Sequence, residues 1–158
     1  MSKSTFTVDR ENLQVTTSRV YNAKPERLFQ AYTDPAQIPQ WWGPAYLTTK
    51  VDKLEAKVGG AWRFVQTEPS GKEHAFNGVY KEIDAPHKIV STFEYEPMAG
   101  HVLVETVTFE EQPDGRTKLT ATAHYENIGD LEGMVAMDME EGAVEGQERL
   151  AKLVEPED

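Results

Sequence analysis

One glutamate interrupts an otherwise apolar row of side chains. Polar and apolar residues alternate over 102–111, which predicts a strand in which Glu105 shares a face with Leu103 and Val107. An unpaired carboxylate on an apolar face is unfavourable, and its pKa rises. Such a group could anchor the polar end of a bound molecule. Alternatively, it pairs with a tyrosine of that face, with Arg63 or with a backbone group, or the end of the strand is open to solvent.

The other reactive residue types form no recognisable catalytic or metal-binding motif. There are no cysteines, which excludes thiol nucleophiles and thiolate metal sites. Gly59-Gly60 separates two predicted strands and does not open a helix, so it does not predict a phosphate-binding loop. No serine lies in a nucleophile-elbow motif. The histidines lack HxH or HxxxH metal-ligand spacing: His74, His87, His101 and His124. We therefore predict no metal, no cofactor and no catalytic residues.

Aromatic side chains dominate the predicted inner face of the other strands. Alternation places them in pairs, each on a common face of its strand. These pairs are Trp62 and Phe64, Phe76 and Tyr80, and Phe93 and Tyr95. They could line a binding cavity, although a packed core has the same pattern. Trp41-Trp42 likewise either packs the short helices against the sheet or, mainly through Trp42, lines the mouth of a cavity.

The C-terminal segment predicts a helix with small residues at its centre. Residues 131–154 contain no proline and would span roughly 35 Å. One stripe of this helix carries Met139, then Gly142, Ala143 and Gly146. Glycine destabilises a helix by about 1 kcal/mol relative to alanine, so two glycines need a compensating role. We interpret them as a gap between helix and sheet that admits a small molecule; tryptophan or phenylalanine side chains could fill that gap instead.

The order of elements that would position these residues is readable from the chain. Residues 13–21 predict a strand, and Pro25 and Pro35 begin two short helices. Residues 47–125 predict about six strands joined by short turns, including a hairpin at Asp114-Gly115. Strands with such short connections are antiparallel neighbours. We therefore predict an α+β fold in which the long terminal helix covers one face of a curved antiparallel sheet.

Length and charge restrict the classes of function. The 158 residues predict a single domain with a core over about 12–154, in which the first ten residues and the C-terminal tail are loose. The formal charge of −11 disfavours nucleic acids and anionic membrane surfaces as partners. No apolar run is long enough to insert into a membrane, and the N-terminus lacks a secretory hydrophobic region. We expect a soluble, cytoplasmic domain that is a monomer or a weak dimer.

Several motifs in register resemble one known family over about residues 12–154. The resemblance implies membership of the activator of heat-shock-protein-90 ATPase homologue family, within the SRPBCC superfamily that includes START and birch-pollen-allergen domains. It also implies a helix-grip fold, in which a curved antiparallel sheet wraps around a long C-terminal helix and two short helices close one end. Such domains commonly hold apolar ligands between sheet and helix. The motifs are Thr33-Asp34-Pro35, Trp41-Trp42-Gly43-Pro44, Gly59-Gly60, Gly78-Val79-Tyr80-Lys81-Glu82-Ile83 and Thr106-Val107-Thr108-Phe109.

Two positions of the terminal helix depart from the family pattern. Family members commonly carry Gly-Trp where this chain has Gly142-Ala143, and an apolar residue where it has Gln147. Replacing an indole by a methyl group would enlarge the cavity, or leave space for Trp62 or Met139. Both departures favour a modified pocket.

These observations favour a non-enzymatic domain that binds a small apolar or amphipathic molecule between sheet and helix. The family resemblance implies a second hypothesis, a co-chaperone-like or stress-response protein that contacts a chaperone. A third is a cyclase- or hydratase-like enzyme, in which Glu105 would act with Tyr80 or Tyr95 as acid and base. The predicted ligand-binding residues are Trp42, Trp62, Phe64, Tyr80, Phe93, Tyr95, Leu103, Glu105, Val107, Met139 and Ala143.

Overall fold

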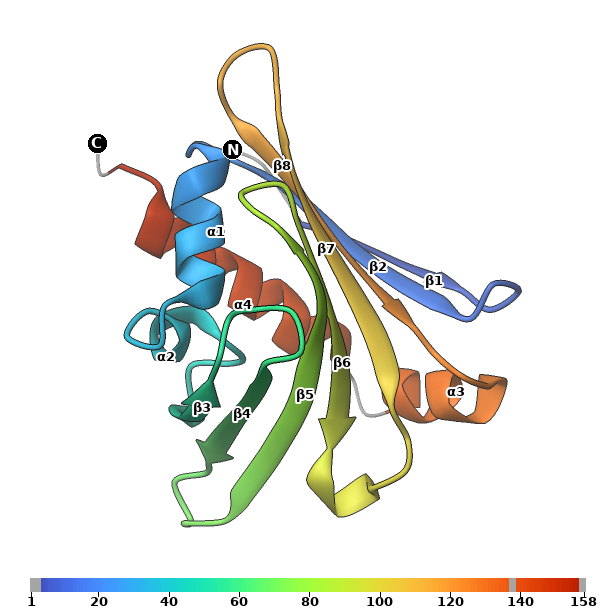
Figure 1. Cartoon of the computed structure of the whole chain (residues 1–158). Helices are drawn as coiled ribbons and strands as arrows, with labels where there is room; N and C mark the ends of the chain where they lie inside the picture. Colours follow the sequence, from blue (N-terminus) through green and yellow to red (C-terminus); the bar gives the residue numbers. More distant parts are fainter. Residues whose placement is uncertain (1–3, 137–138, 157–158) are drawn as a thin grey trace.

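The protein is built on a curved, eight-stranded antiparallel sheet (Figure 1). The computed structural model describes residues 4–136 and 139–156. The strand order is β1-β2-β8-β7-β6-β5-β4-β3, so β1 and β3 form the two edges. The strands are β1 (Thr5–Asp9), β2 (Gln14–Tyr21), β3 (Thr48–Leu54), β4 (Ala61–Thr67), β5 (Glu73–Asp84), β6 (Lys88–Tyr95), β7 (Leu103–Glu111) and β8 (Thr117–His124). The strand and the run of six strands predicted from the sequence are confirmed as β2 and β3–β8.

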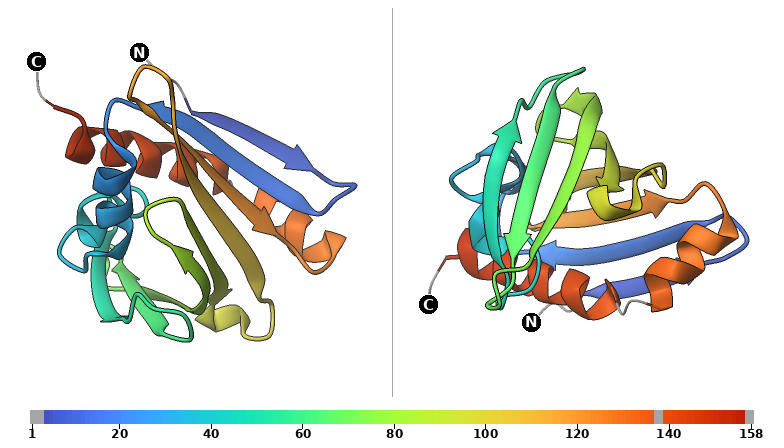
Figure 2. Two further views of the ribbon diagram at one scale, coloured as in Figure 1. Left: turned by 45° about the horizontal axis from the view of Figure 1, so that its top comes forward. Right: turned by 90° about the horizontal axis from the view of Figure 1, so that it is seen from below.

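The helices lie on the concave side of the sheet and beside it, two of them at the left of Figure 1 and one at its lower right (Figures 1 and 2). Helices α1 (Pro25–Thr33) and α2 (Ile38–Trp41) follow β2, and a single 3-10 turn, η1 (Glu96–Met98), follows β6. Helix α3 (Ile128–Ala136) precedes α4 (Met139–Val154), which lies across the concave side. The α+β helix-grip architecture is therefore confirmed.

Two local predictions differ from the structure. The N-terminal segment is not loose throughout, because β1 pairs with β2 from Thr5↔Ser18 to Asp9↔Gln14 and satisfies the backbone groups of that edge. The helical region begins at Ile128, before Leu131, because the Asn127 side chain accepts a hydrogen bond from the Asp130 amide (2.8 Å) and caps α3. Residues 131–154, which were predicted as one helix, include α3 up to Ala136 and α4 from Met139; residues 137–138 lie outside the described residues.

The strand register arranges the inward side chains in rows that cross the sheet. One row runs Tyr80, Ser91, Glu105, Ala123 and Val15, from β5 to β2. The next row toward the β4–β5 hairpin contains Trp62, Gly78, Phe93 and Leu103, and beyond it lie Phe64, Phe76 and Tyr95. In the opposite direction, two rows from Glu105, lie Phe109, Leu119 and Arg19. The rows therefore differ in the size and polarity of their inward side chains.

The tightest part of the core lies under α1 and the C-terminal end of α4. Tyr21, Leu28, Phe109, Leu119 and Leu150 are each no more than 1 % exposed. Rings from α1 cover Phe109, because the Phe29 and Tyr32 centroids lie 5.9 and 5.4 Å from its own, in edge-on geometry. This end of the inner face is closed.

The two glycines of α4 have a different role from the predicted gap over the sheet. A Cβ atom at Gly146 would lie 3.4 Å from the Trp41 carbonyl oxygen, and one at Gly142 would lie 3.9 Å from Pro44 Cδ. Arg149 on the same side of the helix donates a hydrogen bond to the Gly43 carbonyl oxygen (2.7 Å). Gly146 therefore allows α4 to approach the loop after α2 closely, whereas Gly142 leaves room for a Cβ atom.

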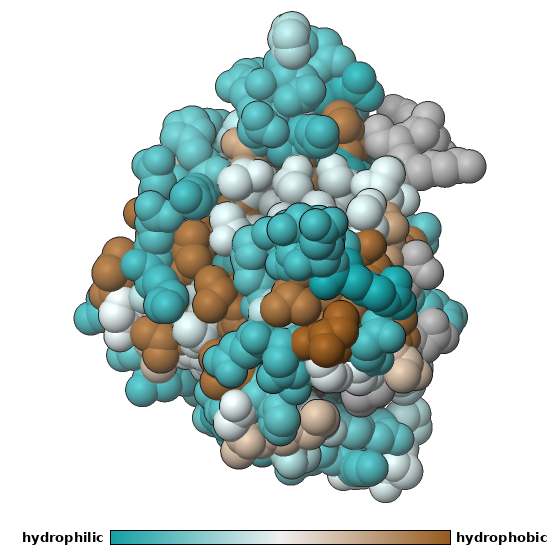
Figure 3. All heavy atoms as spheres, turned by 90° about the vertical axis from the view of Figure 1, so that its right-hand side faces the viewer, coloured by the Kyte–Doolittle hydropathy of each residue, from teal (hydrophilic) through white to brown (hydrophobic). Residues whose placement is uncertain are grey.

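Exposed apolar side chains are scattered over the surface. Figure 3 views the molecule from the side of α3 and shows apolar residues interspersed with hydrophilic ones. On α3 the exposed apolar residues include Ile128 (49 % exposed) and Val135 (37 %). Among the described residues, no helix combines the length and the apolar character that crossing a bilayer requires.

Candidate functional site

Glu105 lies on the inner face of the sheet, as its alternation predicts. Its strand neighbours on that face are Leu103 and Val107, and its cross-strand neighbours are the small residues Ser91 and Ala123. Within residues 4–136 and 139–156, no hydrogen-bond or ion-pair partner contacts its carboxylate. The carboxyl group therefore projects into apolar surroundings.

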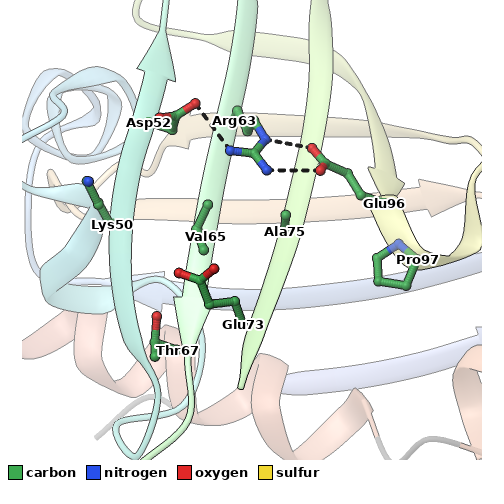
Figure 4. A pocket seen from close by; sticks show the side chains of 9 residues that line it. All are labelled: Lys50, Asp52, Arg63, Val65, Thr67, Glu73, Ala75, Glu96 and Pro97. Atoms are coloured by element: carbon green, nitrogen blue, oxygen red, sulfur yellow. Dashed lines mark hydrogen bonds and ion pairs between the residues drawn. The ribbon is translucent and has the colours of Figure 1, made fainter. Parts of the chain in front are cut away.

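Arg63, one of the possible partners of Glu105, lies on the opposite face of the sheet. It donates two hydrogen bonds to Glu96 (2.8 and 3.0 Å) and one to Asp52 (3.3 Å). These three residues line a surface groove of about 480 Å³ over β3, β4 and β5 (Figure 4). The guanidinium is already neutralised there, so this outer groove offers no free charge to a ligand from Arg63.

The environment of Glu105 differs from that of its neighbours on the same strand and face. Burial raises the pKa of the Glu105 carboxyl to about 7, because the charged form loses hydration. Yet Glu105 retains intermediate solvent accessibility, whereas Leu103, Val107 and Phe109 are 7, 3 and 1 % exposed. A side chain that is enclosed by protein and still accessible to solvent borders open space. Glu105 therefore marks the boundary of the closed core.

Two tyrosines that were absent from the predicted set contribute hydroxyl groups near Glu105. Burial, and then the negative charge of Glu105, raises the pKa of Tyr125 to about 12. Burial raises the pKa of Tyr32 far above its ordinary value, and the negative charges of ionised Tyr21 and Glu105 raise it further. Both phenols stay neutral at physiological pH and can donate or accept hydrogen bonds. Tyr32 comes from α1, which the alternation pattern of the sheet cannot place; Tyr125 continues the alternation of β8.

Aromatic rings continue the inner face from Glu105 toward the β4–β5 hairpin. We call Trp42, Trp62, Phe64, Phe76 and Phe93 the aromatic cluster. The Trp42 ring, which follows α2, lies 6.5, 5.1 and 5.2 Å from the rings of Trp62, Phe64 and Phe76. Trp62 and Phe64 are buried, while Trp42, Phe76 and Phe93 are half-buried. The cluster therefore both packs the α2 loop on the sheet and leaves aromatic surface accessible.

Gly78 is needed for the packing of this cluster. A Cβ atom there would lie within 2.4 Å of the Trp62 indole nitrogen and still closer to the Thr92 carbonyl oxygen. The Trp62 ring therefore lies directly over the backbone of β5, and any larger residue at this position would displace it.

Tyr95 belongs to a separate polar group at the far end of the inner face. Its hydroxyl oxygen is 2.6 Å from His74 Nδ1, and His74 Nε2 is 2.5 Å from a Glu68 carboxylate oxygen. Along β6, Tyr95 is four residues beyond Ser91, the partner of Glu105, which corresponds to roughly 13 Å. Glu105 and Tyr95 are therefore too far apart for direct proton transfer, which leaves Tyr80, in the same row as Glu105, as the tyrosine of the third hypothesis.

The stripe of α4 that faces the sheet changes character along the helix. Leu150, Ala151 and Val154 are buried and apolar near the C-terminus. Gln147 is only 7 % exposed, and its Oε1 atom has no hydrogen-bond partner in the part of the chain that the structure describes. One turn earlier, Ala143 is half-buried. The sheet-facing side chains of α4 therefore become smaller and more polar toward the N-terminus of the helix.

The predicted lining residues fall into two groups by burial. Leu103, Val107, Trp62, Phe64 and Tyr80 are buried, and Trp42, Phe93, Tyr95, Glu105 and Ala143 are half-buried. The side chain of Met139 lies outside the described residues. The half-buried group, without the distant Tyr95, remains the candidate site.

Comparisons with known proteins give the same fold. The crystal structure of Ms6760 from Mycobacterium smegmatis is 25 % identical, with a TM-score of 0.88 over 98 % of this chain and 99 % of that chain. The solution structure of an Arthrobacter aurescens protein is 26 % identical, with a TM-score of 0.86 over 93 % and 88 %. The crystal structure of CV1439 from Chromobacterium violaceum is 27 % identical, with a TM-score of 0.80 over 91 % and 99 %. No curated protein matches.

The family model confirms the resemblance that the motifs indicated. The model described as Activator of Hsp90 ATPase homolog 1-like protein matches residues 22–155, which include all the helices, β3–β8 and every residue of the candidate site. The chain therefore belongs to the Activator of Hsp90 ATPase homolog 1-like protein family.

Proposed function

We propose that this protein binds a small apolar or amphipathic molecule on the inner face of the sheet, between Glu105 and the aromatic cluster, without chemical turnover. The observation that carries the proposal is the partial accessibility of Glu105 among neighbours that are almost fully buried. The half-buried rings of Trp42, Phe76 and Phe93 support it, because they supply apolar surface beside a single polar group. Sites for small molecules typically combine these two features.

Burial of apolar surface would supply most of the affinity. Removing about 200 Å² of apolar ligand surface from water stabilises a complex by roughly 5 kcal/mol before the entropy of association is subtracted. Edge and face contacts with aromatic rings add to this value. Glu105 would then orient the ligand and contribute less to total affinity.

The proposal is tested by nuclear magnetic resonance titration of the full chain with 1-decanol and with naphthalene. Backbone amides of Phe93, Glu105 and Ala123 should shift together with one dissociation constant, whereas those of Val65 and Ala75 on the outer face should not. If neither compound shifts the inner-face amides at its solubility limit, the proposal is wrong.

A matched pair of α4 variants makes this test specific. Ala143→Trp places an indole on the half-buried part of the sheet-facing stripe and should weaken 1-decanol binding at least about tenfold, because the ring occupies the ligand's space. Lys152→Trp adds the same ring at an exposed position of α4 and should leave binding unchanged. Equal affinities for the two variants would place the ligand elsewhere.

The family name supports a second candidate function, contact with a chaperone of the heat-shock-protein-90 type. Such contact would be made by the outer surface and would not require the inner face. Adding the full chain to the purified chaperone should raise its ATPase rate. An unchanged rate at saturating protein, together with no complex in sedimentation, would exclude this function.

A further inference from the structure

The polar groups of the candidate site are rich in hydrogen-bond acceptors. Among the described residues, the Glu105 carboxylate and Gln147 Oε1 both lack a hydrogen-bond partner. The backbone carbonyl oxygen of Gln147, on α4, accepts a hydrogen bond from the Tyr21 hydroxyl (3.3 Å). Tyr32 is close enough to Tyr21 and to Glu105 for both to raise its pKa. Gln147 therefore lies near the Tyr21 row, three rows from Glu105, and each residue offers a separate acceptor that a donor group would satisfy.

The described neighbours of Glu105 provide no positive charge. By element, the groups near Glu105 are Tyr80 on β5, Ser91 on β6, Ala123 on β8, Tyr125 after β8 and Tyr32 on α1. The pKa of Tyr80 is raised by burial to about 12, so all three phenols are neutral at physiological pH. Arg19 faces inward on β2, two rows from Glu105; its guanidinium lies over the Tyr21 ring, 5.4 Å from the centroid, and its Nε atom has no hydrogen-bond partner among the described residues. An ionised Glu105 therefore lacks a counter-charge.

Electrostatics distinguish the ligand classes that could fill this space. An anionic head group would face Glu105 and the net charge of −11, so a fatty-acid anion is disfavoured. An alkylammonium group supplies both the missing counter-charge and several N–H donors. Its alkyl chain can lie on the accessible rings of the aromatic cluster, which also attract cations through their faces.

From this arrangement, and resting on the proposed function, we infer that the inner face selects amphipathic amines, with the ammonium group bound to Glu105 and the alkyl chain on the aromatic cluster. Binding of the cation favours the ionised carboxyl group. Affinity for an amine therefore rises with pH until Glu105 is ionised in the free protein, and affinity for a neutral alcohol does not.

The test compares decylamine, 1-decanol and sodium decanoate by isothermal titration calorimetry on the full chain. Decylamine, like a lysine side chain, stays protonated between about pH 5.5 and about pH 8.5, while the ionised fraction of Glu105 rises roughly 30-fold. Decylamine should therefore bind up to about 30-fold more tightly at the higher pH. 1-Decanol should show little change, and decanoate should bind most weakly of the three at the higher pH.

Glu105→Gln removes the charge while it keeps the shape of the side chain. This variant should lose at least about tenfold in decylamine affinity at the higher pH, lose the pH dependence, and retain 1-decanol binding. A flat profile in the variant also excludes the four histidines as the source of the effect.

The outcomes separate this inference from the proposed function. If 1-decanol binds but decylamine shows no pH dependence, or decanoate binds as tightly as decylamine, the amine selectivity is wrong and the binding function stands. If none of the three compounds binds at either pH, both fail.

Discussion

The two halves of the inner face have the same strand pattern but different degrees of filling. In the closed half, formed by Tyr21, Phe109 and Leu119, every side chain is at most 1 % exposed. In the open half, formed by Glu105 and the aromatic cluster, four of the six members remain half-buried. Strand alternation produces both halves equally, so the difference comes from what covers them. Stability and ligand binding therefore reside in different parts of one sheet.

The cover differs in the size and polarity of its side chains. Over the closed half, α1 contributes Leu28 and Phe29, and α4 contributes Leu150 and Val154. Along α4 toward its N-terminus, the corresponding stripe carries Gln147 and Ala143. Large apolar residues complete a core, whereas small and polar residues leave part of the inner face uncovered, where a ligand can pack.

The largest expected effect is the loss of a ring from the closed half. Phe109→Ala should lower the free energy of unfolding by about 3–5 kcal/mol, because the ring is 1 % exposed and contacts Phe29 and Tyr32. Phe93→Ala, in the open half, should lower it by only about 1–2 kcal/mol, since part of that ring already contacts solvent. Urea denaturation measures both values. Equal losses would mean that the two halves are equally well packed.

The next effect is the pH dependence of stability that Glu105 produces. Its folded-state pKa of about 7 lies above the ordinary value of 4.5, so between these values the folded protein binds more protons than the unfolded chain. This group therefore lowers stability as pH rises from 4.5 to 7, by up to about 3 kcal/mol, and the loss is complete above that range. Glu105→Gln should be more stable than the natural chain by a similar amount at about pH 8.

A second glutamate of the same strand serves as the control for this measurement. Glu110 is exposed, and Glu110→Gln should change stability by less than about 0.5 kcal/mol at any pH. If both variants follow the same pH profile in urea denaturation, Glu105 is hydrated and the open half does not enclose it.

Sequence alone could predict which side chains face inward, but not what approaches them. Alternation placed Glu105 on the inner face correctly, because a strand has a strict period of two. It could not place Tyr32, which reaches Glu105 from α1 through the tertiary fold. Nor could it identify what the α4 glycines face, since helical periodicity gives the side of a helix without its neighbour. In the structure the α4 glycines face the loop after α2, near Gly43.

The smallest effect tests whether those glycines belong to the open half at all. A Cβ atom at Gly142 would meet only Pro44 Cδ, at 3.9 Å, which is an ordinary contact. Gly142→Ala should therefore stabilise the protein by about 0.5–1 kcal/mol through helix propensity, without changing 1-decanol affinity. Gly146→Ala should gain less, because its Cβ atom would lie 3.4 Å from the Trp41 carbonyl oxygen. If the Gly142→Ala protein binds 1-decanol more weakly and gains no melting temperature, Gly142 lines the ligand site.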